Sequence, residues 1–168
     1  MKLVCSLLLA ASALVWAVPA GAQSTSTAAY RIAADTATSG QNPGVQGTPC
    51  VTQTIFFPGD VIVFRAALAE GTSGAPLTQA QIESRGITAV VSVDGRSVPM
   101  RFGPHPPPFV QAPNRALYWS GTLTLTSTHA TGTLPWTLTV SDNTGAKTVY
   151  TPIGQDAGVS VLTVAQKK

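Results

Sequence analysis

The chain has 168 residues, of which 44% are apolar and 10% are charged, and its formal net charge is +3. This length suits one domain of ordinary size. The charged fraction is far below the roughly 25% of an average soluble chain, which excludes a charged coiled coil. It also argues against a nucleic-acid binder, because neutralising phosphates requires clustered Lys and Arg.

Residues 1–22 have the features of a secretory signal peptide. The stretch Leu3–Val18 is mostly apolar but too short for a comfortable membrane span, and the small residues Ala20–Ala22 suit signal peptidase. An uncleaved membrane anchor is the alternative. Cleavage predicts an exported protein without stable membrane insertion, with the periplasm favoured over the outside of the cell.

Residues 23–49 are rich in Ser, Thr, Ala, Gly and Gln and show no sustained apolar period. This composition predicts a flexible arm, in which Tyr30–Ala33 suits a short strand. From residue 50 to residue 168, short apolar runs alternate with turn residues, which is typical of a β-domain. The predicted organisation is therefore signal peptide 1–22, flexible arm 23–49 and β-sandwich domain 50–168.

Eight runs in residues 50–168 have the composition of β-strands. Thr78–Ser84, a polar connection, suits one or two helical turns, and Asp94-Gly95 is a two-residue hairpin signal. The predicted strands are Val51–Phe57, Val61–Ala69, Ile87–Val93, Ser97–Phe102, Leu117–Thr126, Leu134–Val140, Lys147–Ile153 and Val159–Val164. Such short strands with almost no helical period predict an all-β fold, a two-sheet sandwich of about seven to eight antiparallel strands.

Alternation of period two assigns the side chains of these strands to two faces. The residues predicted to face inward are Ile62, Phe64, Ala66 and Leu68 in the second run, Leu117, Trp119, Leu123 and Leu125 in the fifth, and Leu134, Trp136, Leu138 and Val140 in the sixth. Arg65 and Tyr118 are predicted to face outward. Buried tryptophans argue against a carbohydrate platform, for which Tyr118 remains a minor candidate.

Two motifs resemble those of bacterial immunoglobulin-like and cadherin-like extracytoplasmic domains. One is Phe57–Asp60, which enters an alternating strand; the other is Thr131–Thr133, which leads into Trp136–Asp142 and then Asn143–Gly145. The resemblance spans roughly Val51–Val164 and implies an immunoglobulin-like sandwich that binds, spaces or scaffolds without catalysis. The paired cysteines of antibody domains and the calcium-binding acidic motifs of cadherins are missing, so no binding residues are carried over.

A Pro-rich loop at residues 103–115 is the most unusual stretch of the chain. Its consecutive prolines favour a stiff, extended conformation that presents His105 and Phe109, with Arg101 and Arg115 flanking it in sequence. Such rigidity reduces the entropy cost of binding, so these four residues are the candidate surface for a protein partner. The alternative is a connection between sheets, in which the prolines block edge-to-edge aggregation.

A metal site is the second hypothesis. His105, Met100, His129 and Cys50 are of the soft or borderline kind that binds copper, and Met100 and His105 are close in sequence. The spacing is scattered, and the alternative is a buried methionine with two surface histidines. Cys50 could pair with a second chain to give a disulfide dimer, although a small buried thiol is the favoured interpretation.

Catalytic motifs are lacking: there is no nucleophile elbow, metalloprotease helix, phosphate-binding glycine loop or haem motif. The sequence therefore predicts an exported, non-enzymatic binding or scaffolding module without a cofactor. We expect it to recognise a protein partner through loop 103–115. A small periplasmic copper-type protein using His105 and Met100 is the alternative.

Overall fold

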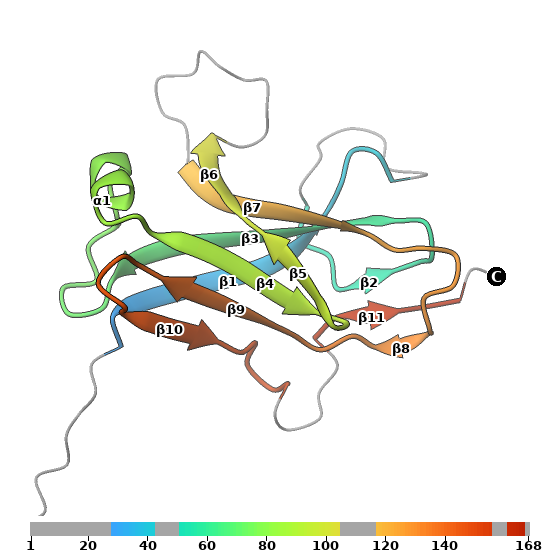
Figure 1. Cartoon of the computed structure of the whole chain (residues 1–168). Helices are drawn as coiled ribbons and strands as arrows, with labels where there is room; N and C mark the ends of the chain where they lie inside the picture. The colour runs from blue at the N-terminus through green and yellow to red at the C-terminus, as the bar shows by residue number, and fades with distance from the viewer. Residues whose placement is uncertain (1–27, 43–50, 105–116, 156–160, 167–168) are drawn as a thin grey trace, which may run out of the picture.

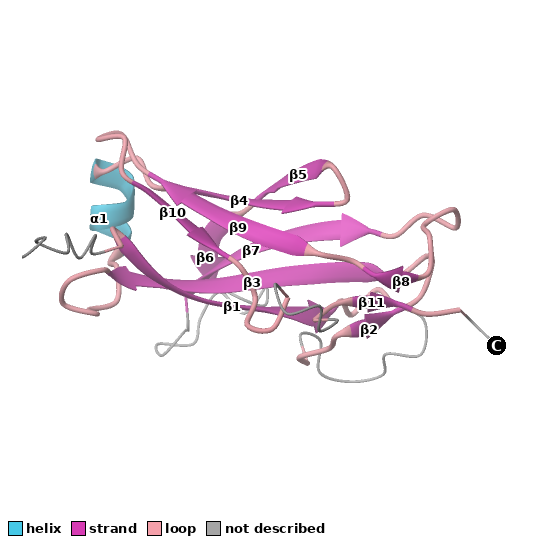
Figure 2. Ribbon diagram, turned by 90° about the horizontal axis from the view of Figure 1, so that it is seen from below, coloured by secondary structure: helices cyan, strands magenta, loops and turns pink. Residues whose placement is uncertain are grey.

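Two four-stranded sheets face each other in the computed structural model of the chain, which describes residues 28–42, 51–104, 117–155 and 161–166 (Figure 1). The first sheet has the strand order β1-β3-β7-β6, and the second sheet has the order β10-β9-β4-β5. Figure 2 shows them as two layers, with helix α1 at one end and a small third sheet at the other. The predicted all-β, two-sheet sandwich is confirmed.

Every strand pair within the two large sheets is antiparallel. The first sheet contains β1 (Tyr30–Thr38), β3 (Val61–Glu70), β7 (Leu117–Thr124) and β6 (Arg101–Pro104). The second contains β10 (Lys147–Tyr150), β9 (Trp136–Ser141), β4 (Thr88–Val93) and β5 (Arg96–Pro99). The small sheet, in the order β2-β11-β8, contains β2 (Ile55–Phe56), β11 (Thr163–Val164) and β8 (Gly132–Thr133). Its β2–β11 pair is parallel, which departs from the antiparallel pattern predicted throughout.

The core lies between the two large sheets and is made by the alternating apolar residues. In β3, Ile62, Phe64, Ala66 and Leu68 are all buried, as the alternation predicts. Trp119 from the first sheet and Trp136 from the second are also buried, and the Trp136 ring lies 5.3 Å from that of Phe64. Apolar burial of this kind contributes about 25 cal/mol per Å² removed from water and is the main force holding the layers together.

Strand β1 corrects the predicted extent of the flexible arm. The arm was expected to contain only a short strand at Tyr30–Ala33, whereas β1 continues to Thr38 and pairs with β3 over its whole length. Beyond the end of β1, the side chain of Asn42 is buried and bonds to the backbone of Val61 as a paired strand would. Its Nδ2 donates to the Val61 carbonyl, and its Oδ1 accepts from the Val61 N–H. This part of residues 23–49 therefore belongs to the sandwich.

The run predicted as one strand over Ser97–Phe102 is two strands in different sheets. β5 pairs with β4 in the second sheet, the chain crosses at Met100, and β6 pairs with β7 in the first. Gly121 of β7 makes this crossing feasible, because a Cβ there would lie only 3.1 Å from the Pro99 carbonyl oxygen and 3.3 Å from Cγ of Met100. The glycine thus lets the crossing chain approach β7 closely.

The predicted turns are confirmed. Asp94 and Gly95 both have positive φ, 50° and 68°, which is the left-handed backbone of a two-residue type I′ hairpin. The predicted helical turns form α1 (Gln79–Ser84), where the side chains of Thr78 and Gln81 make a reciprocal capping box.

Several predicted strands are shorter in the structure. Val51–Phe57 contributes β2, and the described part of the run Val159–Val164 contributes β11, because each of these segments pairs over two residues. Leu117, predicted to face the core, is 41% exposed. It forms the last pair of the β6–β7 ladder, opposite Pro104, where the packing of the interior ends.

The predicted signal peptide, residues 1–22, lies outside the described residues. In the part of the chain that is described, no helix is long and apolar enough to cross a membrane.

Candidate functional site

Of the four predicted partner-binding residues, Arg101 lies in the described part of the chain. It is the first residue of the edge strand β6 and its side chain is exposed. His105, Phe109 and Arg115 lie outside the described residues. The structure nevertheless fixes where their loop is attached, because Pro104 and Leu117, on either side of it, face each other across the β6–β7 ladder.

Arg101 belongs to a row of polar side chains across the outer face of the first sheet. The register pairs Asp35 with Arg65, Arg65 with Ser120, and Ser120 with Arg101. Because directly opposed residues project from the same face of a sheet, all four point away from the core. We call these four residues the outer-face row. It carries the predicted residue Arg101 at one end and an ion pair at the other.

The ion pair of the outer-face row is bidentate. Arg65 Nε donates to Asp35 Oδ1 at 2.8 Å and Arg65 Nη2 to Asp35 Oδ2 at 2.5 Å. The Thr52 hydroxyl also donates to Asp35 Oδ2, at 3.2 Å. The Asp35 side chain is 40% exposed, so it presents an oriented carboxylate to solvent.

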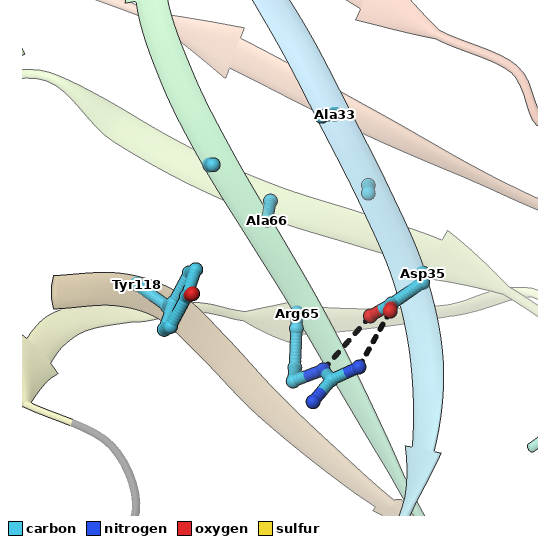
Figure 3. Close-up of a pocket in the computed structure, with 7 residues that line it drawn as sticks. Ala33, Asp35, Arg65, Ala66 and Tyr118 are labelled. Carbon is cyan, nitrogen blue, oxygen red and sulfur yellow. Dashed lines mark hydrogen bonds and ion pairs between the residues drawn. The ribbon is translucent and has the colours of Figure 1, made fainter. Parts of the chain in front are cut away.

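A hollow of about 320 Å³ adjoins the outer-face row. Its lining residues are Ala33, Ala34, Asp35, Arg65, Ala66, Ala67 and Tyr118. Figure 3 shows Tyr118 on one side of Arg65 and Asp35 on the other. The Tyr118 side chain, predicted to face outward, is 37% exposed, and its cross-strand neighbour in β6 is Gly103, which leaves the ring uncovered on that side.

The sequence did not identify the Asp35–Arg65 pair as part of a site. The two residues are separated by 30 positions, and neither belongs to a motif. The alternation in Val61–Ala69 does place Arg65 outward, but Asp35 falls in the region predicted to be a flexible arm. Without β1 there was no sheet partner for Arg65, so the pair could be found only from the register.

Met100, one of the two predicted metal ligands, lies in the core at the chain crossing and is 7% exposed. The other, His105, and the cysteine Cys50 lie outside the described residues. Among the residues that are described, no three His, Cys, Asp or Glu side chains are grouped closely enough to hold a metal ion.

His129 corrects the expectation of two surface histidines, because its side chain is only 4% exposed. Its Nδ1 accepts a hydrogen bond from the Thr126 N–H at 2.8 Å, while Nε2 lies 3.3 Å from Asp94 Oδ2. The imidazole therefore connects the turn that follows β7 to the hairpin between β4 and β5. This position fits a structural role.

A second charged group, the Asp142 cluster, contains Tyr30, Glu70, Arg85, Asp142 and Thr144. The Tyr30 hydroxyl donates to Asp142 Oδ2, and Arg85 Nη2 donates to the Tyr30 oxygen at 2.8 Å and to Asp142 Oδ2 at 3.2 Å. The opposite side of the guanidinium pairs with Glu70 at 2.5 Å. The cluster therefore joins β1, β3, the end of α1 and the turn after β9.

The Asp142 carboxylate is saturated with donors. Oδ1 accepts from the Thr144 N–H and hydroxyl and from the Ala146 N–H, and the Asp142 side chain is 1% exposed. Hydrogen bonds from Thr144 and then from Tyr30 hold the pKa of Asp142 well below its usual range. Burial, followed by the bond to Asp142, raises the pKa of Tyr30 to about 12. With no oxygen left for a ligand, the cluster stabilises the fold.

Comparison with known proteins adds no relative. No protein-family model, curated protein or solved structure matches this chain.

Proposed function

We propose that the chain is an exported, non-enzymatic immunoglobulin-like module that recognises a protein partner through loop 103–115 and the adjoining outer face of the first sheet. The observation that carries this proposal is the position of Arg101. It lies exposed in the edge strand from which the Pro-rich loop departs, in a row with Ser120 and Arg65.

The attachment of the loop also supports binding. Pro104 and Leu117 are held opposite each other by the β6–β7 ladder, so a stiff proline segment would start and end at fixed points on the sheet. Fixing both ends of a loop reduces the conformational entropy that binding must remove. Leu117 is exposed at this edge and adds apolar surface beside the loop.

A capture experiment tests the proposal. The tagged full chain is used as bait in an envelope extract of the source organism, beside a variant that combines His105→Ala, Phe109→Ala and Arg115→Ala. We expect a specific protein to be recovered by the native chain and lost by the variant. A second variant, Arg101→Ala, should reduce recovery about tenfold, as expected for an arginine anchor in a binding surface.

The control is Lys147→Ala. Lys147 is also an exposed cation at the end of a strand, but its strand, β10, belongs to the second sheet. Recovery of the same partner by Lys147→Ala would show that the loss is specific. Equal recovery by the native chain and the triple loop variant would contradict the proposal.

A further inference from the structure

The hollow over β1, β3 and β7 combines an apolar floor with two oriented polar groups. Ala33 and Ala67 are small, exposed residues that face each other across the β1–β3 ladder and leave the backbone uncovered. Tyr118, Arg65 and Asp35 also line the hollow, and Figure 3 shows Arg65 between the other two. Small-ligand sites have this composition, an apolar surface with a few fixed polar groups that set orientation.

The oriented carboxylate matches a sugar hydroxyl. The bidentate pair with Arg65 and the hydrogen bond from Thr52 hold the Asp35 carboxylate in place beside the hollow. A ligand hydroxyl can donate a hydrogen bond to this partly exposed, charged acceptor. Because the pair is neutral overall, it favours an uncharged ligand over an anion or a cation.

The apolar parts match the face of a sugar ring. Tyr118 offers an aromatic surface next to alanines, and the C–H face of a pyranose packs on such a surface while its hydroxyls stay in contact with water or polar groups. The volume of about 320 Å³ lies at the lower end of the range for ligand pockets and suits one ring.

A second hollow, of about 240 Å³, continues the first. It shares Ala33 and Ala67 with it and extends along β1 and β3 to Arg31 and Pro76. The two together form a trough with space for a second ring beside the first. We propose that this trough binds a neutral oligosaccharide, with one ring on Tyr118 and a hydroxyl of that ring bonded to the Asp35 carboxylate. This trough lies on the same outer face as the proposed partner surface and shares Tyr118 with it, but sugar binding does not require loop 103–115.

Titration of the ¹⁵N-labelled full chain tests the site directly. The probes are maltose, cellobiose, xylobiose and chitobiose with their monosaccharides and hexasaccharides, and an oligogalacturonate as the acidic counterpart. We expect at least one neutral series to shift the amide signals of Ala33, Ala67 and Tyr118, with a dissociation constant on the order of 1 mM for the disaccharide, as an open site allows. The disaccharide should bind more tightly than the monosaccharide, because the second hollow accepts its second ring.

Three variants and a control localise the binding. Tyr118→Ala should weaken it about tenfold through the loss of stacking. Asp35→Asn should weaken it by removing the charged acceptor, and Ala67→Gln by filling the floor with a side chain that an exposed strand position tolerates. Thr124→Ala, an exposed change elsewhere on β7, should bind as the native chain does.

The proposal is overturned if no neutral saccharide shifts these signals, or if the acidic oligosaccharide binds more tightly than every neutral one. It is also overturned if Tyr118→Ala and Ala67→Gln, both folded by their amide spectra, bind like the native chain. Partner capture through loop 103–115 is a different readout, so a failure here leaves that result unchanged.

Discussion

Two charged groups on neighbouring parts of the same sandwich are built in opposite ways. In the Asp142 cluster the carboxylate is buried and its two oxygens accept hydrogen bonds from Tyr30, Arg85, Thr144 and Ala146. In the outer-face row, the carboxylate of Asp35 is bidentate with Arg65 but 40% exposed. The oxygens of the Asp142 carboxylate are fully hydrogen-bonded within the protein, whereas the Asp35 carboxylate is partly exposed to solvent.

The contrast separates polar residues that join segments of the fold from polar residues that contribute little to its stability. A buried carboxylate is tolerated only if every lone pair has a donor, so the Asp142 cluster is committed to joining its four segments. A surface ion pair such as Asp35–Arg65 contributes little to stability, and its carboxylate remains partly exposed. We therefore expect substitution of the two carboxylates to differ strongly in its effect on stability.

The largest expected effect is that of Asp142→Ala. The change removes the acceptor of the Tyr30 hydroxyl and the carboxylate that pairs with Arg85. Buried donors of the cluster then lose their partners, which is strongly destabilising. We expect Tm, followed by circular dichroism, to fall by about 10 °C or more. Glu83→Ala, an exposed acidic residue on the neighbouring helix, is the control and should leave Tm nearly unchanged. Similar Tm values for the two variants would remove the distinction between the groups.

Tyr30→Phe should have the next largest effect. It keeps the buried ring and its packing but removes the hydroxyl that donates to Asp142 and accepts from Arg85. We expect the free energy of unfolding, from urea titration, to decrease by about 1–2 kcal/mol. In the double variant Tyr30→Phe/Asp142→Ala, the two losses should not add, because they remove the same interaction. Strict additivity would show that the hydroxyl acts independently of the carboxylate.

The pH dependence of stability separates the contributions of Tyr30 and Asp142. The folded pKa of Tyr30 is raised from 10.0 to about 12, so its contribution is complete below pH 10 and is lost as the pH rises toward 12. The pKa of Asp142 is lowered, so its contribution is complete above the ordinary aspartate range and is lost as the pH falls below that range. The difference in unfolding free energy between native chain and Tyr30→Phe should be constant from neutral pH to pH 10 and narrow above it. A difference that widens above pH 10 would contradict the assignment.

Asp35→Ala should have the smallest effect on stability. The Asp35–Arg65 pair is partly exposed, and such pairs contribute about 0–1 kcal/mol. Urea titration should therefore find a loss below about 1 kcal/mol, in contrast to the loss from Asp142→Ala at a residue of the same type. A loss as large as that of Asp142→Ala would mean that the outer-face row supports the fold instead of being available for a ligand.

Local pattern was sufficient for much of the fold. Period-two alternation identified the buried face of β3 and the inward positions of Trp119 and Trp136, and Asp94-Gly95 identified its hairpin. These features depend on neighbours in the sequence, so they can be predicted from it. Leu117 was misplaced because alternation says which face a residue occupies but not where the opposing layer ends.

The long-range features could not be predicted in this way. The alternation of Ser97–Phe102 has no visible break, so the exchange of sheets at Met100 shows only in the hydrogen-bond register. Asp142 has the sequence context of an ordinary turn aspartate, while its partner Tyr30 lies 112 residues away. The outer-face row likewise needs the register of four strands before its residues come together.

Photocrosslinking at Tyr118 is the most direct test of recognition by the outer face of the first sheet. Replacing Tyr118 by p-benzoylphenylalanine keeps an aromatic side chain at an exposed position next to the loop edge, and the same replacement at the exposed Val149 of the second sheet is the control. In cells, irradiation should crosslink the Tyr118 variant, and not the Val149 variant, to one protein. Combining His105→Ala, Phe109→Ala and Arg115→Ala with the Tyr118 replacement should abolish this crosslink. Crosslinking to that protein from Val149 alone, or from Tyr118 with the loop residues removed, would contradict recognition by this face and its loop.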